Sequence, residues 1–225
     1  MSEKPSHPPV QRVGLTMRIT KANGYEEPRD SLAQDWAQFM SASLPEVAWM
    51  SVPNTGSTAA SVVEDWRLDA LILTGGDDIG ETPLRDETER TLLHHFIDNG
   101  MPVFGVCRGM QLIQSEFGGN LRPCSRDEHV ASRHEVEFRS ASPWPTPNQG
   151  AVSVNSFHTM AVHPDDLGEG LIPLAISADG YVEALYASDI PLLAVMWHPE
   201  REASLREHDR SLLRRLFGFG EDAEL

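Results

Sequence analysis

Cys107 stands in the stretch of this sequence that carries the strongest signal for covalent chemistry. A short apolar run over 101–106 leads into it, and Gly105 and Gly109 lie two residues before and after it. Small neighbours are needed where a strand turns sharply into a helix and strains the backbone of a nucleophile. Such a turn places the sulfur at the positive end of the helix and close to backbone N–H groups that can receive an oxyanion. The stretch predicts a cysteine nucleophile, with a buried structural cysteine as the alternative.

His198 and Glu200 could complete the chemistry of a thiolate, which needs a proton shuttle and a group that orients the shuttle. Both follow an apolar run over 192–196. In extended backbone, residues two apart point the same way, so the two side chains can form a hydrogen bond side by side. The tripeptide alone is commonplace, but together with Cys107 it predicts the histidine–glutamate half of a triad.

Gly75 and Gly76 form a third signal, directly after the apolar run 68–73 and Thr74. Paired glycines at the end of a strand let the backbone come close to a ligand, and a glycine N–H there can be an oxyanion donor. An ordinary tight turn is the alternative interpretation.

The elements that must position these residues alternate between strands and helices. That alternation predicts an α/β fold with a mostly parallel central sheet, in which the ends of successive strands meet at one edge. Asp30 or Ser31 is expected to cap the first helix, whose apolar positions share one face. The expected strands are 13–19, 47–52, 68–73 and 101–106, and the expected helices are about 32–40, 58–66, 86–99 and 108–117. Further strands, partly antiparallel, are expected over 136–139, 152–155, 171–177, 181–187 and 192–196, with a last helix over about 203–217.

Length and charge narrow the function classes. The 225 residues suit a single domain, which we place over 11–220 after a disordered lead-in over 1–10. The net charge of 18 − 34 = −16 repels phosphate backbones and anionic membranes, so nucleic-acid binding and membrane attachment are not expected. The N-terminus has no apolar core typical of a secretory signal, and no apolar run is long enough to span a membrane. A cytoplasmic location is therefore expected.

Neither a cofactor nor a metal ion is expected from the sequence. Cys124, His129 and His134 could suggest a metal site, but their irregular spacing argues against one. The two cysteines, Cys107 and Cys124, stand in such different surroundings that a disulfide is not expected.

Taken together, the motifs resemble those of the class I glutamine amidotransferases. The shared motifs are Thr74-Gly75-Gly76, the segment 105–111 and His198-Pro199-Glu200. Three further motifs resemble the branch that contains γ-glutamyl-γ-aminobutyrate hydrolase, which acts without a synthase domain. These are Arg85-Asp86-x-x-Glu89, Val154-Asn155-Ser156-x-His158 and Asp179-Gly180-x-x-Glu183-Ala184.

The resemblance implies a flavodoxin-like three-layer fold and hydrolysis of a γ-glutamyl amide through a thioester. In that mechanism Cys107 is the nucleophile, His198 the general base and then acid, and Glu200 its orienting group. The implied oxyanion donors are the backbone N–H groups of Gly76 and Arg108. The side chains implied to bind the glutamyl part are Gln111, Asn155, Ser156, Phe157 and His158; a strand end with polar capping groups is the alternative for 155–158.

The segment from Tyr25 to Trp36 is similar to a smaller group in the same branch, the γ-glutamyl-CDP-amidate hydrolases of capsular phosphoramidate synthesis. Within it Arg29 could bind a phosphate, or could simply pair with Glu26 or Asp30 on the surface. The loop 77–84 looks shorter than in the γ-aminobutyrate enzymes, so their amine specificity is not transferred.

Several functions stay open at this point. The first is a hydrolase that acts alone on a small γ-glutamyl substrate, and the second is a glutaminase subunit of a separate synthase, which is less favoured. A catalytically silent binding module and a different enzyme with a similar cysteine turn are the remaining alternatives. A homodimer is left open.

Overall fold

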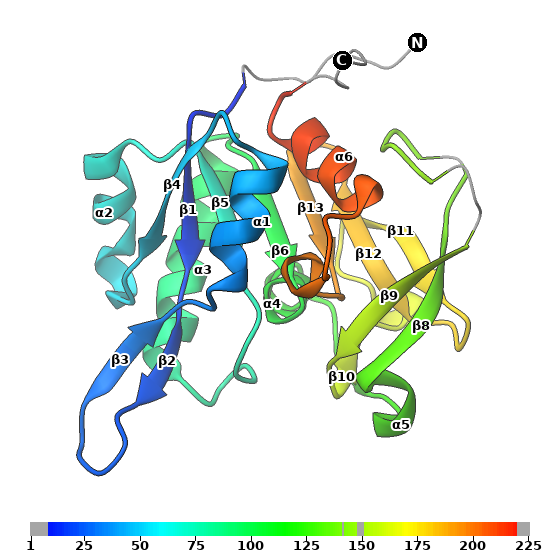
Figure 1. Cartoon of the computed structure of the whole chain (residues 1–225), viewed down its shortest axis with the longest axis horizontal. Helices are drawn as coiled ribbons and strands as arrows, with labels where there is room; N and C mark the ends of the chain where they lie inside the picture. Colours follow the sequence, from blue (N-terminus) through cyan, green and yellow to red (C-terminus); the bar gives the residue numbers. More distant parts are fainter. Residues whose placement is uncertain (1–8, 141, 148–150, 220–225) are drawn as a thin grey trace.

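The computed structural model describes residues 9–140, 142–147 and 151–219 (Figure 1). Most of the lead-in expected over 1–10 lies outside these residues. Val10 lies inside them, where its side chain is buried in the core and its N–H bonds the carbonyl of Phe217 at 2.9 Å. The packed chain therefore includes Val10.

A nine-stranded mixed sheet forms the centre of the described residues, in the order β4-β1-β5-β6-β13-β12-β11-β8-β9. The first five of these strands run parallel to one another. Their bounds are β4 Ala48–Val52, β1 Arg12–Thr16, β5 Ala70–Leu73, β6 Val103–Val106 and β13 Leu192–Val195. The others pair antiparallel and are β12 Val182–Ala187, β11 Leu171–Ser177, β8 Val130–Phe138 and β9 Ala151–Phe157.

The register of the parallel strands determines where the residues expected to react are placed. Leu73 pairs with Gly105, and Val106 pairs with Val195. Strands β5, β6 and β13 consequently end at the same edge of the sheet, and the residues that follow each of them meet there.

Helices cover both faces of the sheet and give the molecule its three layers. One face carries α1 (Asp35–Ser43) and α6 (Glu207–Leu216), which lie together in front of the sheet in Figure 1. The other carries α2 (Ala59–Trp66), α3 (Pro83–Asp98) and α4 (Arg108–Glu116). Each face has its own apolar core, one including Trp36 and Leu213, the other Leu92 and Met110. The expected α/β three-layer fold is confirmed.

The N-terminal segment differs from the sequence-based expectation. The strand expected over 13–19 is divided into β1 and β2 (Arg18–Lys21), and β2 forms a hairpin with β3 (Pro28–Ser31). Asp30 and Ser31 therefore do not cap a helix, and α1 begins at Asp35. The Asp30 carboxylate instead accepts bonds from the backbone and side-chain nitrogens of Asn54, at 2.9 and 2.6 Å.

Small elements complete the described chain. They are the β7 (Arg122–Pro123) and β10 (Met160–Ala161) pair, α5 (Arg126–His129), and the 3₁₀ turns Gly56–Thr58, Pro164–Asp166 and Pro199–Arg201. Among the described residues, none of the helices has the length and apolar character that crossing a bilayer requires.

Candidate active site

Cys107 occupies a strained turn between β6 and α4. Its φ of 51° and ψ of −104° lie in a region that non-glycine residues rarely adopt, and its N–H is held by the carbonyl of Val195 at 2.8 Å. The close packing of the turn explains its glycines. A Cβ at Gly109 would lie 2.2 Å from the carbonyl oxygen of Leu73, and one at Gly105 would lie 2.7 Å from Ile113 Cδ1.

His198 and Glu200 lie beside this turn, just after β13. His198 Nδ1 is 2.7 Å from Glu200 Oε1, and both side chains are buried. Gly75 leaves the room in which they meet Cys107: a Cβ there would lie 2.5 Å from His198 Cε1 and 3.5 Å from Cys107 Cβ. The structure therefore brings together the three side chains expected to form a triad.

Asn155, in the edge strand β9, fixes the backbone of His198. Its Oδ1 accepts the His198 N–H at 2.9 Å, and its Nδ2 donates to the His198 carbonyl at 2.8 Å and to Glu202 at 2.8 Å. The amide is thus engaged in positioning the histidine.

The charges of the site favour a thiolate beside an imidazolium. Burial alone would raise the pKa of the Cys107 thiol, but the charge of His198 and its hydrogen bond to the sulfur bring that pKa below its ordinary value. Burial alone would lower the pKa of His198, but Cys107 and Glu200 outweigh that effect and raise this pKa to about 9. Near neutral pH the cysteine is therefore poised to attack and the histidine to donate a proton.

These shifts predict a bell-shaped dependence of kcat/KM on pH. Activity should rise as the thiol loses its proton, below the ordinary thiol pKa, and fall near pH 9 as His198 loses the proton that the leaving nitrogen needs. In Glu200→Gln the upper limb should move to lower pH, because the carboxylate that helps to hold the proton is gone. A pH profile of glutamate release measures both limbs; an upper limb that stays in place in Glu200→Gln would contradict the assignment.

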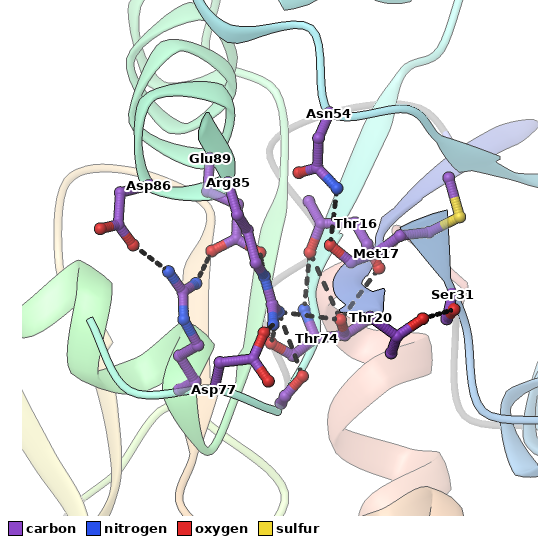
Figure 2. Close-up of polar contacts among 12 residues, drawn as sticks. Thr16, Met17, Thr20, Ser31, Asn54, Thr74, Asp77, Arg85, Asp86 and Glu89 are labelled. Carbon is purple, nitrogen blue, oxygen red and sulfur yellow. Dashed lines mark hydrogen bonds and ion pairs between the residues drawn. The ribbon is translucent and has the colours of Figure 1, made fainter. Parts of the chain in front are cut away.

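The loop after β5 is held by a buried arginine of α3. Arg85 Nη2 donates to the carbonyl of Thr74 at 2.9 Å and to that of Gly75 at 3.1 Å (Figure 2). Gly76, the expected oxyanion donor, follows with a φ of 131°, and a Cβ there would lie 2.7 Å from Arg85 Nη1. Arg85 thereby fixes the peptide planes of the loop that faces Cys107.

Arg108 begins α4 directly after the nucleophile, but its side chain turns away from Cys107. Its guanidinium bonds Glu89 and Asp86, and Glu89 also accepts from Arg85 Nε at 2.8 Å. The motif residues Arg85, Asp86 and Glu89 thus lie together on α3 (Figure 2). All three are buried, and Asp86 and Glu89 bond the buried Arg108. Burial lowers the pKa of both arginines to about 10, and the carboxylates beside them keep them charged at neutral pH.

The side chains expected to bind the glutamyl group are largely engaged with the protein itself. Gln111 Nε2 donates to the carbonyl of Met160 at 3.0 Å, and Ser156 Oγ donates to that of His129 at 2.8 Å. His158 Nε2 faces Glu183 Oε1 at 3.5 Å. Phe157 is 42% exposed, with its ring edge-on to His198.

Arg29 does not reach this group of residues. It lies in the exposed β2–β3 hairpin, where its Nε is 2.5 Å from Glu27 Oε1 and its Nη2 is 2.5 Å from the hydroxyl of Tyr25. Its expected role with a phosphate stays a prediction.

A pocket opens beside Gly75 and Glu200, and its lining includes an arginine that no sequence motif marked. Arg18, at the start of β2, makes no side-chain hydrogen bond or ion pair with another described residue, and a Cβ at Gly76 would lie 3.4 Å from its Nε. Arg201 also faces the pocket, 3.6 Å from Glu200. The lining residues are Arg18, Ser31, Leu32, Ala33, Trp36, Thr74, Gly75, Glu200 and Arg201.

The chain is similar to known proteins in both sequence and fold. The chain is 29% identical to γ-glutamyl-CDP-amidate hydrolase of Campylobacter jejuni, over 86% of this chain and 92% of the relative. It is 33% identical to the glutamine amidotransferase-like protein YvdE of Lactococcus lactis, over 64% of this chain and 71% of the relative. A solved structure from Thermoplasma acidophilum, described as a GMP synthase subunit, shares the fold at a TM-score of 0.69, with 21% identity and 94% coverage of both chains.

The family model of Peptidase C26 matches residues 13–200, which include all three strand ends that meet at the candidate site. The chain belongs to the Peptidase C26 family and is class I glutamine amidotransferase-like.

Proposed function

We propose that the protein hydrolyses a γ-glutamyl amide bond and acts without a synthase partner. The observation that carries the proposal is Cys107, strained at the start of α4 next to the buried His198–Glu200 pair. Family membership and the γ-glutamyl hydrolase among the relatives support the same reaction.

The reaction proceeds in two halves. The Cys107 thiolate attacks the γ-carbonyl carbon, and the oxyanion that forms accepts bonds from the N–H groups of Gly76 and Arg108. The C–N bond then breaks as His198 gives its proton to the leaving nitrogen, which leaves a γ-glutamyl thioester. In the second half His198 takes a proton from water as the water oxygen attacks the thioester carbon. The C–S bond then breaks, glutamate is released, and the Cys107 thiolate and protonated His198 are restored. Glu200 holds the imidazole in the orientation that both halves need.

The leaving group that we favour is a phosphoramidate, as in γ-glutamyl-CDP-amidate. Arg18 faces the pocket beside the triad with no carboxylate partner among the described residues. A planar guanidinium in that position can bind a phosphate oxygen pair, and it supplies local positive charge in a chain whose net charge is −16. The relative from C. jejuni supports the same substrate class.

Arg18→Met should therefore impair turnover of the phosphate-bearing substrate alone. We expect kcat/KM for a γ-glutamyl nucleotide phosphoramidate to fall about 30-fold, a loss near 2 kcal/mol, because a charge-assisted bond to phosphate is removed. Turnover of γ-glutamyl-γ-aminobutyrate should change little. Arg90→Met, at a surface arginine of α3 that is paired with Glu116 at 2.8 Å, is the matched control. Equal losses on both substrates would count against a phosphate contact.

The experiment that tests the function is glutamate release from a panel of γ-glutamyl compounds by the purified protein. The panel contains glutamine, γ-glutamyl-γ-aminobutyrate, γ-glutamyl-polyamines and γ-glutamyl-CDP-amidate. Fast release from a member other than glutamine supports a hydrolase that acts alone. The second candidate, a glutaminase subunit, is favoured by the glutamine amidotransferase-like relative and predicts slow release from glutamine only.

A further inference from the structure

A cluster of three histidines surrounds the carboxylate of Glu183, under the end of the β8–β9 hairpin. His129 is the last residue of α5, His134 lies in β8, His158 follows β9, and Glu183 lies in β12. The side chains of His129, His158 and Glu183 are at most 1% exposed, and that of His134 is 14% exposed. Titratable side chains from four separate parts of the chain thus lie together in the interior of the protein.

The atoms that face each other in this cluster are too far apart for hydrogen bonds. Glu183 Oε2 is 3.4 Å from His134 Nε2, and Glu183 Oε1 is 3.5 Å from His158 Nε2 and 3.7 Å from His129 Nδ1. In the described chain these three ring nitrogens and both carboxylate oxygens lack a hydrogen-bond partner. A buried carboxylate without hydrogen bonds is costly, so something else must balance its charge.

The outward nitrogens of two of the imidazoles show which tautomer each ring holds. His129 Nε2 lies 2.9 Å from Asp179 Oδ2, and His158 Nδ1 lies 3.1 Å from the carbonyl of Met160. His134 Nδ1 lies 3.4 Å from the carbonyl of Glu128. The oxygens of Asp179 and Met160 accept hydrogen bonds of normal length, so the outward nitrogens of His129 and His158 carry the proton. The inward nitrogen of each of these two rings, when neutral, then presents a lone pair to Glu183. Metal-bound histidines show this same arrangement, with the far N–H bonded to a carboxylate or a carbonyl.

We propose that His129, His134, His158 and Glu183 bind a divalent transition-metal ion, with Zn²⁺ as the best fit. Around Zn²⁺, nitrogen and oxygen ligands at about 2.1 Å in a tetrahedron lie roughly 3.4 Å from one another. Glu183 Oε1 lies 3.5 Å from His158 Nε2 and 3.7 Å from His129 Nδ1, close to that spacing, and its second oxygen, Oε2, lies 3.4 Å from His134 Nε2. Imidazolium–carboxylate bonds would be shorter, at about 2.8 Å. One ligand atom each of His129, His134 and Glu183 lies within 4.8 Å of the other two, and His158 Nε2 lies 3.5 Å from Glu183 Oε1.

No metal site is expected from the sequence, because Cys124, His129 and His134 are the only ligands that its pattern suggests. Their spacing along the chain is irregular, and the carboxylate ligand, Glu183, comes from a strand about fifty residues away. Cys124 lies at the edge of the cluster, with its Sγ 3.7 Å from His158 Nδ1. That nitrogen is the outward one, which faces the carbonyl of Met160 rather than Glu183. The sulfur therefore lies on the far side of the ring, and we leave Cys124 out of the ligand set.

The proposed ion would join parts of the chain that position the active site. It links β12 to the end of β9, the strand that carries Asn155, which holds the backbone of His198. All four positions are filled by protein, as is typical of structural zinc sites. We therefore assign it a structural role, independent of the proposed hydrolase activity.

The test is zinc binding by untagged protein that carries Cys107→Ala, so that the active-site thiolate cannot hold the ion. After chelator treatment, competition with a chromophoric chelator should show one equivalent of Zn²⁺ bound, and zinc should raise the melting temperature. Co²⁺ in place of zinc should give the visible absorption of a tetrahedral site.

His134→Ala should weaken zinc binding about 100-fold or more and abolish the zinc-dependent rise in melting temperature. His94→Ala, on the exposed side of α3, and Cys124→Ser should both bind zinc as the parent does. Circular dichroism confirms that each variant is folded. No zinc binding by the parent, or equal binding by His134→Ala, would overturn the proposal, and loss in Cys124→Ser would overturn the ligand set.

Discussion

Cys107→Ala is expected to abolish glutamate release from every γ-glutamyl substrate, with kcat reduced about 10⁴-fold or more. Without a thiolate there is no covalent intermediate, and only binding and the oxyanion donors remain to accelerate hydrolysis. Alanine removes the sulfur but keeps the backbone of the turn, in which the N–H of residue 107 bonds the carbonyl of Val195. Substrate should therefore still bind, and its Kd measured by calorimetry should change little.

Cys124→Ser is the matched control for this prediction. Cys124 is the only other cysteine in the sequence, and burial, with help from Glu183 and Asp179, raises the pKa of its thiol to about 11. Its thiol is therefore protonated near neutral pH, whereas Cys107 is the thiolate. Iodoacetamide should label Cys107 first, in step with the loss of activity. Wild-type turnover by Cys107→Ala, or loss of activity in Cys124→Ser, would refute the role of Cys107.

Arg108→Met is expected to destabilise the fold by about 3–5 kcal/mol, because removing one partner of a buried ion pair leaves charge uncompensated. Arg108 bonds Glu89 and Asp86, and the Glu89 side chain is fully buried. Methionine fills much of the space but cannot compensate a carboxylate. The substitution leaves the backbone N–H of residue 108 in place, so the effect measured is that of the side chain.

Urea denaturation of the two proteins measures this loss as a lower transition midpoint. Arg90→Met is the matched control, because Arg90 lies on the same helix as Glu89 but is half exposed, paired with Glu116 at 2.8 Å. An exposed pair contributes at most about 1 kcal/mol, so the control should be nearly as stable as the wild type. If Arg108→Met and Arg90→Met lost equal stability, burial of the Arg108 ion pairs would not be the reason that they stabilise the fold.

Local signals explain which elements could be predicted from the sequence. Short apolar runs at 68–73, 101–106 and 192–196 become β5, β6 and β13, because a strand buried on both faces must be apolar throughout. The glycines beside Cys107 mark a turn whose close contacts leave no room for a Cβ. Strand ends, glycines and the histidine–glutamate pair could therefore be identified before any contact was known.

Other parts of the site depend on contacts between residues far apart in the chain. Asp30 has the residue type of a helix cap, but its carboxylate binds Asn54, which no local pattern reveals. Arg18 reaches the pocket only because β2 leaves the central sheet to pair with β3. Glu183 meets three histidines only once β12, β8 and β9 are in place. Long-range pairing decides such features, and the sequence alone could not predict them.

The central claim is that Cys107 carries a γ-glutamyl group during turnover, and rapid-quench mass spectrometry tests it most directly. Protein mixed with an excess of its best substrate is quenched in acid, digested and analysed for the peptide that contains residue 107. We predict that this peptide gains the mass of one γ-glutamyl group, that hydroxylamine removes it, and that Cys107→Ala shows no gain. Turnover at full rate with no adduct on this peptide at any quench time, or an adduct on another residue, would contradict the account.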